Sequence, residues 1–236
     1  MTALEVCVDT LEGAKAAIAG GAERIELCSS LSEGGLTPSN GLMQAAAQLS
    51  KPCFAMIRPR SGLFHFNDDD MEIMLKDIAT ARTAGLAGVV LGIQNEAGAL
   101  DIARLRILLE AAGPLGTTLH RVIDVVSDPL LALRQAIDLG FNRVLTSGAE
   151  PFAPDGAALI AQMVRAADGQ ISVMPGCGLT PENVQSVVQA TGVSEVHAAC
   201  SVKAAGDPAF SDFDPPAGRY MTSTPEVRRF VDALMN

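Results

Sequence analysis

The segment Leu4-Glu5-Val6-Cys7-Val8-Asp9 decides the fold, together with Arg24-Ile25-Glu26-Leu27-Cys28-Ser29 further along the chain. In both segments aliphatic residues alternate with charged or sulfur-containing ones, and a period of two is typical of a β-strand. Longer segments with apolar residues three and four positions apart follow and predict helices. Two of these helices are expected to start at Asp128-Pro129 and Thr180-Pro181, where a capping side chain precedes a proline.

The same alternation continues along the chain and predicts eight strands. Eight units in 236 residues correspond to about 30 residues per unit, the size of one β–α element. Strict alternation gives a parallel sheet, and eight such units predict a closed (β/α)8 TIM barrel forming a single domain over residues 1–236. The strands are expected near residues 4–9, 24–29, 53–59, 88–93, 117–123, 143–147, 170–175 and 195–200.

An open, doubly wound sheet is the alternative architecture. Its dinucleotide-binding form needs Gly-x-Gly-x-x-Gly after the first strand, and this motif is absent there, so no nucleotide cofactor is expected. The eighth strand is followed by a long segment, Val202–Thr224, which is rich in Pro and Gly. A loop longer than a routine connection is typical of a lid or an interface segment.

Composition and charge narrow the classes of partner. The chain has 17 Lys and Arg against 27 Asp and Glu, a formal net charge of −10, and a pI near 4.7. Binding to nucleic acid or to an anionic membrane surface needs a basic face, so neither partner is expected. Nearly half of the residues (48%) are hydrophobic, which is typical of a globular chain.

The compartment is predicted from the first residues and from the cysteines. The sequence begins without a basic, apolar signal segment, and its longest apolar stretch is too short to span a bilayer. An odd number of cysteines without an export signal favours free thiols in a reducing cytoplasm. The five cysteines are Cys7, Cys28, Cys53, Cys177 and Cys200.

Charged side chains are predicted to face the inside of the barrel. The aliphatic face of the first two strands should meet the helices, so Glu5, Cys7, Glu26 and Cys28 should point inward. Barrel interiors are usually packed and apolar, and charges there must be paired. A structural ion network and a ligand site are both open interpretations. The expected network contains Glu5, Glu26, Arg58, His120, Arg121 and Asp124, with Met56, Thr146 and His197 also inward.

The cysteine pair offers a metal site. Cys7 and Cys28 fall on neighbouring strands and on the same side, and adjacent strands lie about 4.8 Å apart. Two thiolates at that separation suit Cu(I), whereas harder cations prefer oxygen ligands. Two small buried core residues are the alternative interpretation. No Cys-x-x-Cys or His-Glu-x-x-His is present, so a dedicated zinc site is only weakly supported.

A second candidate site is predicted at the loop Gly176-Cys177-Gly178, which follows the seventh strand. TIM barrels often bind phosphate after strands 7 and 8, so the candidate is a small anionic ligand, including a phosphorylated one. Were the chain an enzyme, Glu26, His120 and Asp124 would be its acid–base groups. No lysine lies inside a predicted strand, which argues against Schiff-base chemistry. The expected ligand-binding residues are Arg58, Arg121, Ser147, Gly176, Gly178 and His197.

Several motifs together resemble the CutC copper homeostasis family, and the resemblance covers nearly the whole chain. It implies a TIM barrel in the cytoplasm, a role in copper handling and self-association as a dimer or tetramer. It also implies that Cys7 and Cys28 are the Cu(I) ligands. The motifs are Glu5-Val6-Cys7-Val8-Asp9, residues 20–29, 32–39 and 56–60, His120-Arg121, Asp124, residues 143–148 and 176–179, Asn183 and His197.

The sequence departs from the family pattern at three positions near the predicted barrel mouth. Leu63 stands where the family usually has an Asp, and Ala199 replaces the Ser of a His-x-Ser motif. Cys177 interrupts a Gly-Gly-Gly motif. These changes bear on any shared catalytic activity more than on the fold. Copper handling through Cys7 and Cys28 is therefore the leading hypothesis, and a TIM-barrel enzyme acting on a small anion is the alternative.

Overall fold

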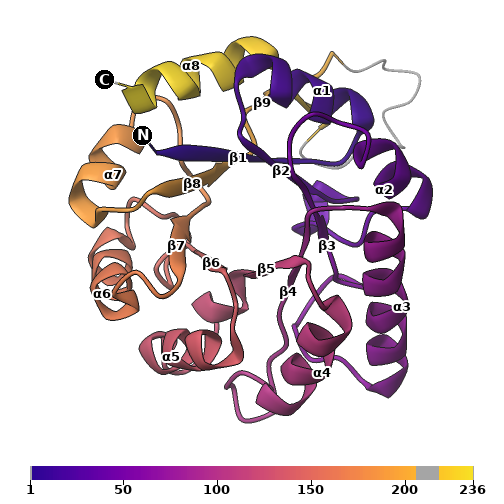
Figure 1. Ribbon diagram of the computed structural model, residues 1–236. Coiled ribbons are helices and arrows are strands. Elements are labelled where there is room, and N and C mark those ends of the chain that lie inside the picture. Colours follow the sequence, from indigo (N-terminus) through magenta and orange to yellow (C-terminus); the bar gives the residue numbers. More distant parts are fainter. Residues whose placement is uncertain (1, 206–217, 236) are drawn as a thin grey trace.

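Eight parallel strands form a nearly closed barrel surrounded by helices, as the computed structural model shows for residues 2–205 and 218–235 (Figure 1). The hydrogen-bonded order is β7-β6-β5-β4-β3-β2-β1-β8, and β8 returns beside β7. All the ladders between these strands are parallel. The TIM-barrel prediction is confirmed.

Strands and helices alternate along the chain in the order expected from the sequence. The barrel strands are β1 (Ala3–Val8), β2 (Arg24–Leu27), β3 (Cys53–Met56), β4 (Gly88–Leu91), β5 (Gly116–Leu119), β6 (Arg143–Thr146), β7 (Ser172–Pro175) and β8 (Glu195–Ala198). The helices are α1 (Leu11–Gly20), α2 (Asn40–Ala46), α3 (Asp68–Ala84), α4 (Ile102–Ala112), α5 (Pro129–Leu139), α6 (Ala157–Ala167), α7 (Val184–Thr191) and α8 (Thr224–Met235), with short 3-10 helices η1 (Leu31–Glu33) and η2 (Arg121–Asp124).

Capping side chains set several of the helix starts. Asp128 accepts from the amide of Leu131 and precedes Pro129 at the first position of α5, as expected. The predicted start at Thr180-Pro181 is wrong, because these residues form a turn and α7 begins only at Val184. The carboxamide of Asn183 closes that turn by accepting from the amide of Thr180.

Two apolar clusters lie on opposite faces of the sheet. The larger cluster fills the space between strands and helices and contains the outward-facing Val6, Ile25 and Leu27 of β1 and β2. The smaller one lies inside the barrel and comprises Cys28, Phe54, Met56 and Val90. Cys28 and Met56 therefore face the lumen, as the alternation predicts.

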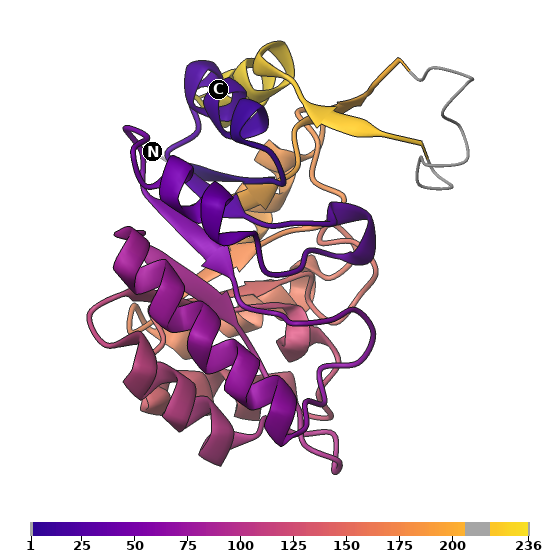
Figure 2. The ribbon, with the colours of Figure 1, turned by 90° about the vertical axis from the view of Figure 1, so that its right-hand side faces the viewer.

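Two segments differ from the expected secondary structure. Strand β5 ends at Leu119, and residues 121–123, expected as strand, belong to η2 because the His120 ring accepts from the amide of Val122 and caps that turn. The segment 202–224 is not wholly irregular, since β9 (Ser201–Lys203) and β10 (Tyr220–Thr222) pair as an antiparallel hairpin that projects from the barrel (Figure 2). Residues 206–217 of that segment lie outside the described part of the chain.

Candidate metal and ligand site at the barrel mouth

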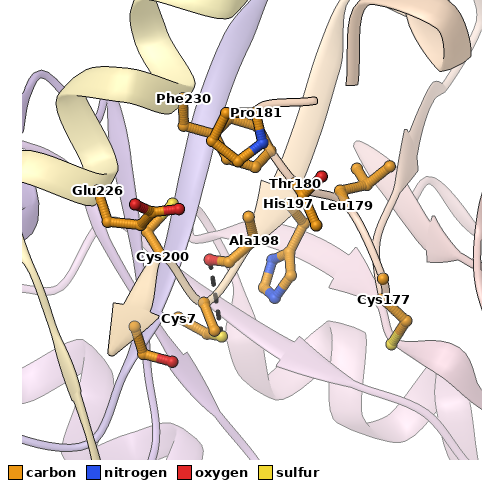
Figure 3. A pocket seen from close by; sticks show the side chains of 13 residues that line it. Cys7, Cys177, Leu179, Thr180, Pro181, His197, Ala198, Cys200, Glu226 and Phe230 are labelled. Atoms are coloured by element: carbon orange, nitrogen blue, oxygen red, sulfur yellow. Dashed lines mark hydrogen bonds between the residues drawn. The ribbon is translucent and has the colours of Figure 1, made fainter. Parts of the chain in front are cut away.

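A pocket of about 320 Å³ opens at the carboxyl ends of β1, β7 and β8, the end where TIM barrels carry their sites (Figure 3). Cys7 and His197 form its inner wall, and α8 contributes Glu226 and Phe230. Three of the five cysteines reach this pocket. Its other lining residues follow β7 or lie between the end of β8 and the start of β9, namely Cys177, Gly178, Leu179, Thr180, Pro181, Ala198, Ala199, Cys200 and Ser201.

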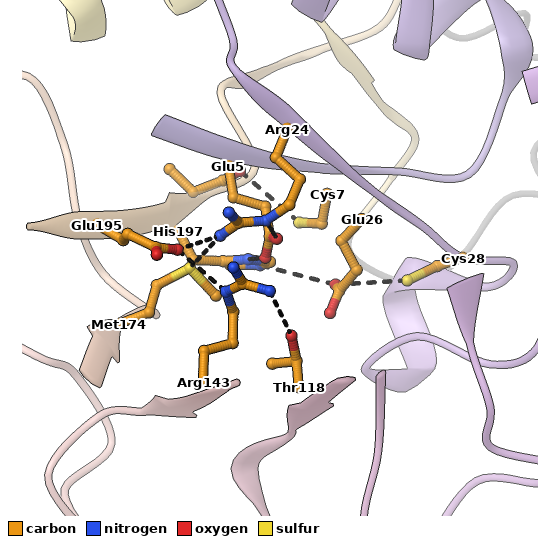
Figure 4. Close-up of polar contacts among 11 residues, drawn as sticks. Glu5, Cys7, Arg24, Glu26, Cys28, Thr118, Arg143, Met174, Glu195 and His197 are labelled. Atoms are coloured by element: carbon orange, nitrogen blue, oxygen red, sulfur yellow. Dashed lines mark hydrogen bonds and ion pairs between the residues drawn. The ribbon is translucent and has the colours of Figure 1, made fainter. Parts of the chain in front are cut away.

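Cys7, Glu26 and His197 come together just below this pocket. The ladders place Cys7 beside Glu26, and Glu5 beside His197, so their side chains leave the same face of the sheet (Figure 4). One ligand atom from each of Cys7, Glu26 and His197 lies within 4.8 Å of the other two. The thiol of Cys7 also makes a long contact of 3.8 Å to the Ala198 carbonyl oxygen.

His197 lies between two buried carboxylates. Its Nδ1 is 2.8 Å from Oε1 of Glu5, and its Nε2 is 3.7 Å from Oε2 of Glu26. Burial alone raises the pKa of Glu5, but the hydrogen bond with His197 and the charge of Arg24 lower that pKa to about 2. Burial opposes a charged His197, yet Cys7 and Glu26 raise its pKa well above the usual value. Burial raises the pKa of Glu26.

An ion network closes the barrel below this cluster (Figure 4). Arg24 pairs with Glu5 and Glu195, and Arg143 pairs with Glu195 at 3.0 Å. Both guanidinium groups lie over the Phe54 ring, 5.5 and 5.1 Å from its centroid. Arg143 and Glu195 were not predicted to join the network, although each is a charged residue at the first position of its strand, which was the available signal.

Cys28 is more buried than Cys7 but lies closer to the carboxyl end of the barrel. Glu26 is the register partner of Cys7, and Cys28 follows two residues later, so the two sulfurs are offset by one pleat on the same side of the sheet. The Cys28 thiol is fully buried and donates to Oε2 of Glu26 at 3.5 Å. Burial raises the pKa of this thiol well above its usual value, and the neighbouring Glu26 adds to the effect.

The guanidinium of Arg58, expected to bind an anion, donates hydrogen bonds to backbone carbonyl oxygens. Its terminal nitrogens donate to the carbonyl oxygens of Glu33, Gly35 and Gly62 at 2.9–3.1 Å. The side chain also lies over the ring of Phe64, 5.1 Å from the centroid. Arg58 thus fixes the loops after β2 and β3, with only Nε left without a partner among the described residues.

Arg121 and Asp124 form a pair across the first turn of η2. Arg121 Nε donates to Oδ2 of Asp124 at 2.8 Å, and its terminal nitrogens reach Ser147 Oγ at 2.6 Å and Cys177 Sγ at 2.8 Å. Asp124 also accepts from Thr146 Oγ1 and from the amides of Ser147 and Ala149. Because the Asp124 carboxylate accepts all these hydrogen bonds, it holds Arg121 and the end of β6 in place.

His120 is buried and neutral. Its Nδ1 accepts from the amide of Val122 at 3.1 Å, so its Nε2 carries the proton, and this Nε2 has no partner among the described residues. The ring packs against Phe64, with centroids 4.6 Å apart, and a Cβ added to Gly92 would lie 2.6 Å from it. Burial and the charge of Arg58 lower the pKa of His120 to about 3.

The loop Gly176-Cys177-Gly178 borders the pocket with a strained backbone. Cys177 has a φ of +73°, a conformation that costs a residue with a Cβ about 1–2 kcal/mol. Gly176 donates to the Thr146 carbonyl oxygen, and a Cβ on it would lie 2.7 Å from Leu145. The amides of Cys177, Gly178 and Leu179 donate no hydrogen bond to any described residue.

The departures from the family pattern lie at different places. Leu63 is largely exposed on the loop after β3, whereas Ala199 and Cys177 line the pocket. No helix in the described part of the chain is long and apolar enough to cross a bilayer.

Fold and site together define a TIM-barrel protein with a charged lumen and with sulfur, imidazole and carboxylate groups at the catalytic end of the barrel. The model of the CutC family matches residues 2–202, and the chain belongs to this family. CutC family proteins of Sinorhizobium medicae and Vibrio cholerae are each 49% identical to it. The first alignment covers 84% of this chain and 81% of the relative, and the second covers 82% and 78%.

Solved structures agree with this assignment. A CutC protein from Streptococcus agalactiae, named for copper homeostasis, superimposes with a TM-score of 0.81 at 34% identity, over 84% of this chain and 99% of its own. Phosphoribosylanthranilate isomerase from Thermotoga maritima matches with a TM-score of 0.61 over the full length of both chains. Its 15% identity shows a shared fold only.

Proposed function

We propose that this CutC protein handles copper in the cell, binding Cu(I) at the barrel mouth through Cys7 and Cys28. The observation that carries the proposal is the position of both sulfurs on the lumen side of adjacent strands, with Cys7 at the wall of an open pocket. The name of the Streptococcus agalactiae relative supports the same function. Copper would be the protein's cargo, and the open pocket beside Cys7 would be its route in and out.

The donor atoms suit a soft monovalent ion. Cu(I) prefers sulfur ligands, and thiols bind it as thiolates. Burial raises the pKa of Cys28, so this thiol keeps its proton in the metal-free protein and must release it when copper binds. Glu26 accepts the thiol proton of Cys28 in a hydrogen bond and is placed to take it up.

A competition titration against a coloured Cu(I) chelator, under anaerobic reducing conditions, tests this proposal. Replacing both residues, Cys7→Ser and Cys28→Ser, is expected to weaken Cu(I) binding at least 100-fold, and each single replacement should weaken it by a smaller factor. Cys53→Ser is the matched control, because Cys53 is buried between sheet and helix and donates to the Ala46 carbonyl oxygen, away from the lumen. Equal affinity in the double variant and the wild type would end the proposal.

A small anionic ligand is a second candidate for the same pocket. The supporting observation is the loop after β7, whose amides have no partner among the described residues and border the pocket beside the imidazole of His197 and the hydroxyl of Ser201. Anions bind to such backbone amides, and TIM barrels use this loop for phosphate.

Thermal unfolding with phosphate and with a matched chloride control tests the second candidate. Binding should raise the melting temperature of the wild type in phosphate only, and Arg121→Gln should abolish the shift, because Arg121 holds Cys177 in the loop. An equal shift in chloride, or an unchanged shift in the variant, would contradict it.

We also propose a cytoplasmic location and a homo-oligomeric state. The five cysteines are free thiols, which fits a reducing compartment. The exposed hairpin of β9 and β10 is the proposed contact between copies of the chain.

A further inference from the structure

We infer that Cys7, Glu26 and His197 form a three-ligand site for a borderline divalent transition metal such as zinc, cobalt or iron, distinct from the pair of sulfurs proposed for Cu(I). The two sites share Cys7, but the divalent site uses one sulfur, one imidazole nitrogen and one carboxylate. Cys28 is not one of its ligands.

The spacing of the three ligand atoms is close to what an ion requires. They lie within 4.8 Å of one another, and His197 Nε2 is 3.7 Å from Glu26 Oε2. A tetrahedral ion with bonds of about 2.0–2.3 Å holds its ligands about 3.3–3.8 Å apart, so side-chain shifts of about 1 Å would close the site. The three residues sit on adjoining strands β1, β2 and β8, which fixes their backbones.

Glu5 supplies the outer contact that such sites usually have. It lies 2.8 Å from Nδ1 of His197, which leaves Nε2 directed toward Glu26. A histidine ligand nearly always donates its other ring N–H to a carboxylate or carbonyl, which orients the ring and strengthens it as a ligand. Glu5 is itself fixed by Arg24. The ring orientation is therefore prearranged.

An ion network alone does not account for the cluster. Pairing between His197 and Glu5 explains the Nδ1 contact, but Oε1 of Glu26 is buried with no hydrogen-bond partner in the described part of the chain. Glu26 is only 3% exposed, so this atom is shielded from solvent. A bound cation beside Cys7 would satisfy the orphaned oxygen.

The ligand set also selects the class of metal. One thiolate, one imidazole and one carboxylate suit borderline divalent ions, whereas Cu(I) is satisfied by two sulfurs. Cys7 and His197 both line the pocket, so the side of the ion away from Glu26 would face it (Figure 3). Three protein ligands with an open fourth position are typical of zinc sites that bind water or a substrate.

Cobalt(II) titration of the reduced, metal-free protein tests this inference. We expect one Co(II) per chain, with a sulfur-to-cobalt charge-transfer band in the near ultraviolet that is lost in Cys7→Ser. His197→Asn keeps a donor for Glu5 but removes the Nε2 ligand, and Glu26→Gln removes the carboxylate charge. Each should weaken Co(II) binding at least 10-fold, and competition with zinc should displace the cobalt.

Cys28→Ser separates the two sites. Cys28→Ser should weaken Cu(I) binding, keep the Co(II) affinity within about twofold of wild type and leave the Co(II) spectrum unchanged. His197→Asn should weaken Co(II) binding and keep the Cu(I) affinity within about twofold of wild type. Far-ultraviolet circular dichroism checks that each variant folds. If His197→Asn does not fold, the Co(II) affinity of Glu26→Gln takes its place in the test. A Co(II) complex without the thiolate band, or unchanged Co(II) affinity in the folded variants, would overturn the inference.

Discussion

Single residues in the barrel interior differ in how their charge is accommodated. Cys7 and Glu26 beside His197 raise the pKa of its ring, whereas burial and the charge of Arg58 lower the pKa of His120, which packs against Phe64. Both histidines are buried, so the difference lies in their partners and not in their exposure. The same side chain therefore has opposite electrostatic roles at two positions of one barrel.

The neutral state of His120 makes the protein sensitive to acid. Its pKa falls from 6.5 to about 3 on folding, so the unfolded chain takes up a proton first as the pH drops. The stability that comes from keeping His120 neutral is fully present above pH 6.5 and is lost as the pH falls toward 3. Between pH 6.5 and 4.5 the loss should reach about 2 kcal/mol.

His120→Asn checks this prediction, because the Asn side-chain oxygen can accept from the Val122 amide without titrating. Urea unfolding at pH 6.5, 5.5 and 4.5 should show a shallower loss of stability in the variant than in the wild type. Glu5, with a pKa of about 2, adds to the acid loss only below its usual value of 4.5. Parallel pH profiles for the two proteins would contradict the assignment.

The sequence predicted which side chains face the lumen but not all of their partners. Strand alternation placed Glu5, Glu26 and His197 correctly, because every second residue of a strand shares a face. Arg58 was expected at an anion and instead donates to three loop carbonyls. Its partners depend on the conformation of two loops, which no periodicity in the sequence determines.

At the scale of the elements, one aromatic ring and two glycines determine the packing at the amino ends of the strands, the floor of the barrel. Phe54 on β3 spreads across β4 and β5, and a Cβ on Gly88 would lie 2.2 Å from the ring and 2.5 Å from the Gly116 carbonyl oxygen. Arg24 and Arg143 cover the same ring. Glycine at residue 88 therefore permits the close packing of strand, ring and ion network.

Gly88→Ala should lower the free energy of unfolding by about 2–3 kcal/mol, because neither the ring nor the backbone can move away freely. Gly41→Ala is the control, since a Cβ there meets nothing within 4 Å and lies in α2. That change should be neutral or stabilise by about 0.5–1 kcal/mol. Chemical denaturation of both variants measures the difference, and equal stabilities would refute this account of the floor.

The order of strands and helices was predictable because each β–α unit carries its own periodicity. The residues at which they end were less predictable. The strand expected over 117–123 ends early because the His120 ring caps η2. The hairpin of β9 and β10 was missed, since short exposed strands have no apolar alternation to mark them.

At the scale of the whole molecule, that hairpin is the feature that departs from a plain barrel (Figure 2). Val202, Tyr220 and Met221 are all more than 40% exposed on it. A two-stranded hairpin is marginally stable alone, and an exposed apolar cluster is typical of an interaction surface. We therefore expect the hairpin to contact a second copy of the chain.

Light scattering should give a wild-type mass of two or four times 24.5 kDa. Met221→Glu should shift this mass toward 24.5 kDa, because it places a charge in the apolar cluster. Ile107→Glu changes a similarly exposed apolar residue on α4 and should leave the mass unchanged. A monomeric wild type, or dissociation only in the α4 variant, would count against the hairpin.

The lumen and the pocket meet at Cys7, and both proposed metal sites use this sulfur as a ligand. The most direct measurement is anomalous diffraction at the copper edge from crystals loaded with Cu(I) under reducing conditions. We expect a peak within bonding distance of Cys7 Sγ, on the lumen side of β1. A peak confined to other residues, or no peak in fully reduced crystals, would contradict it.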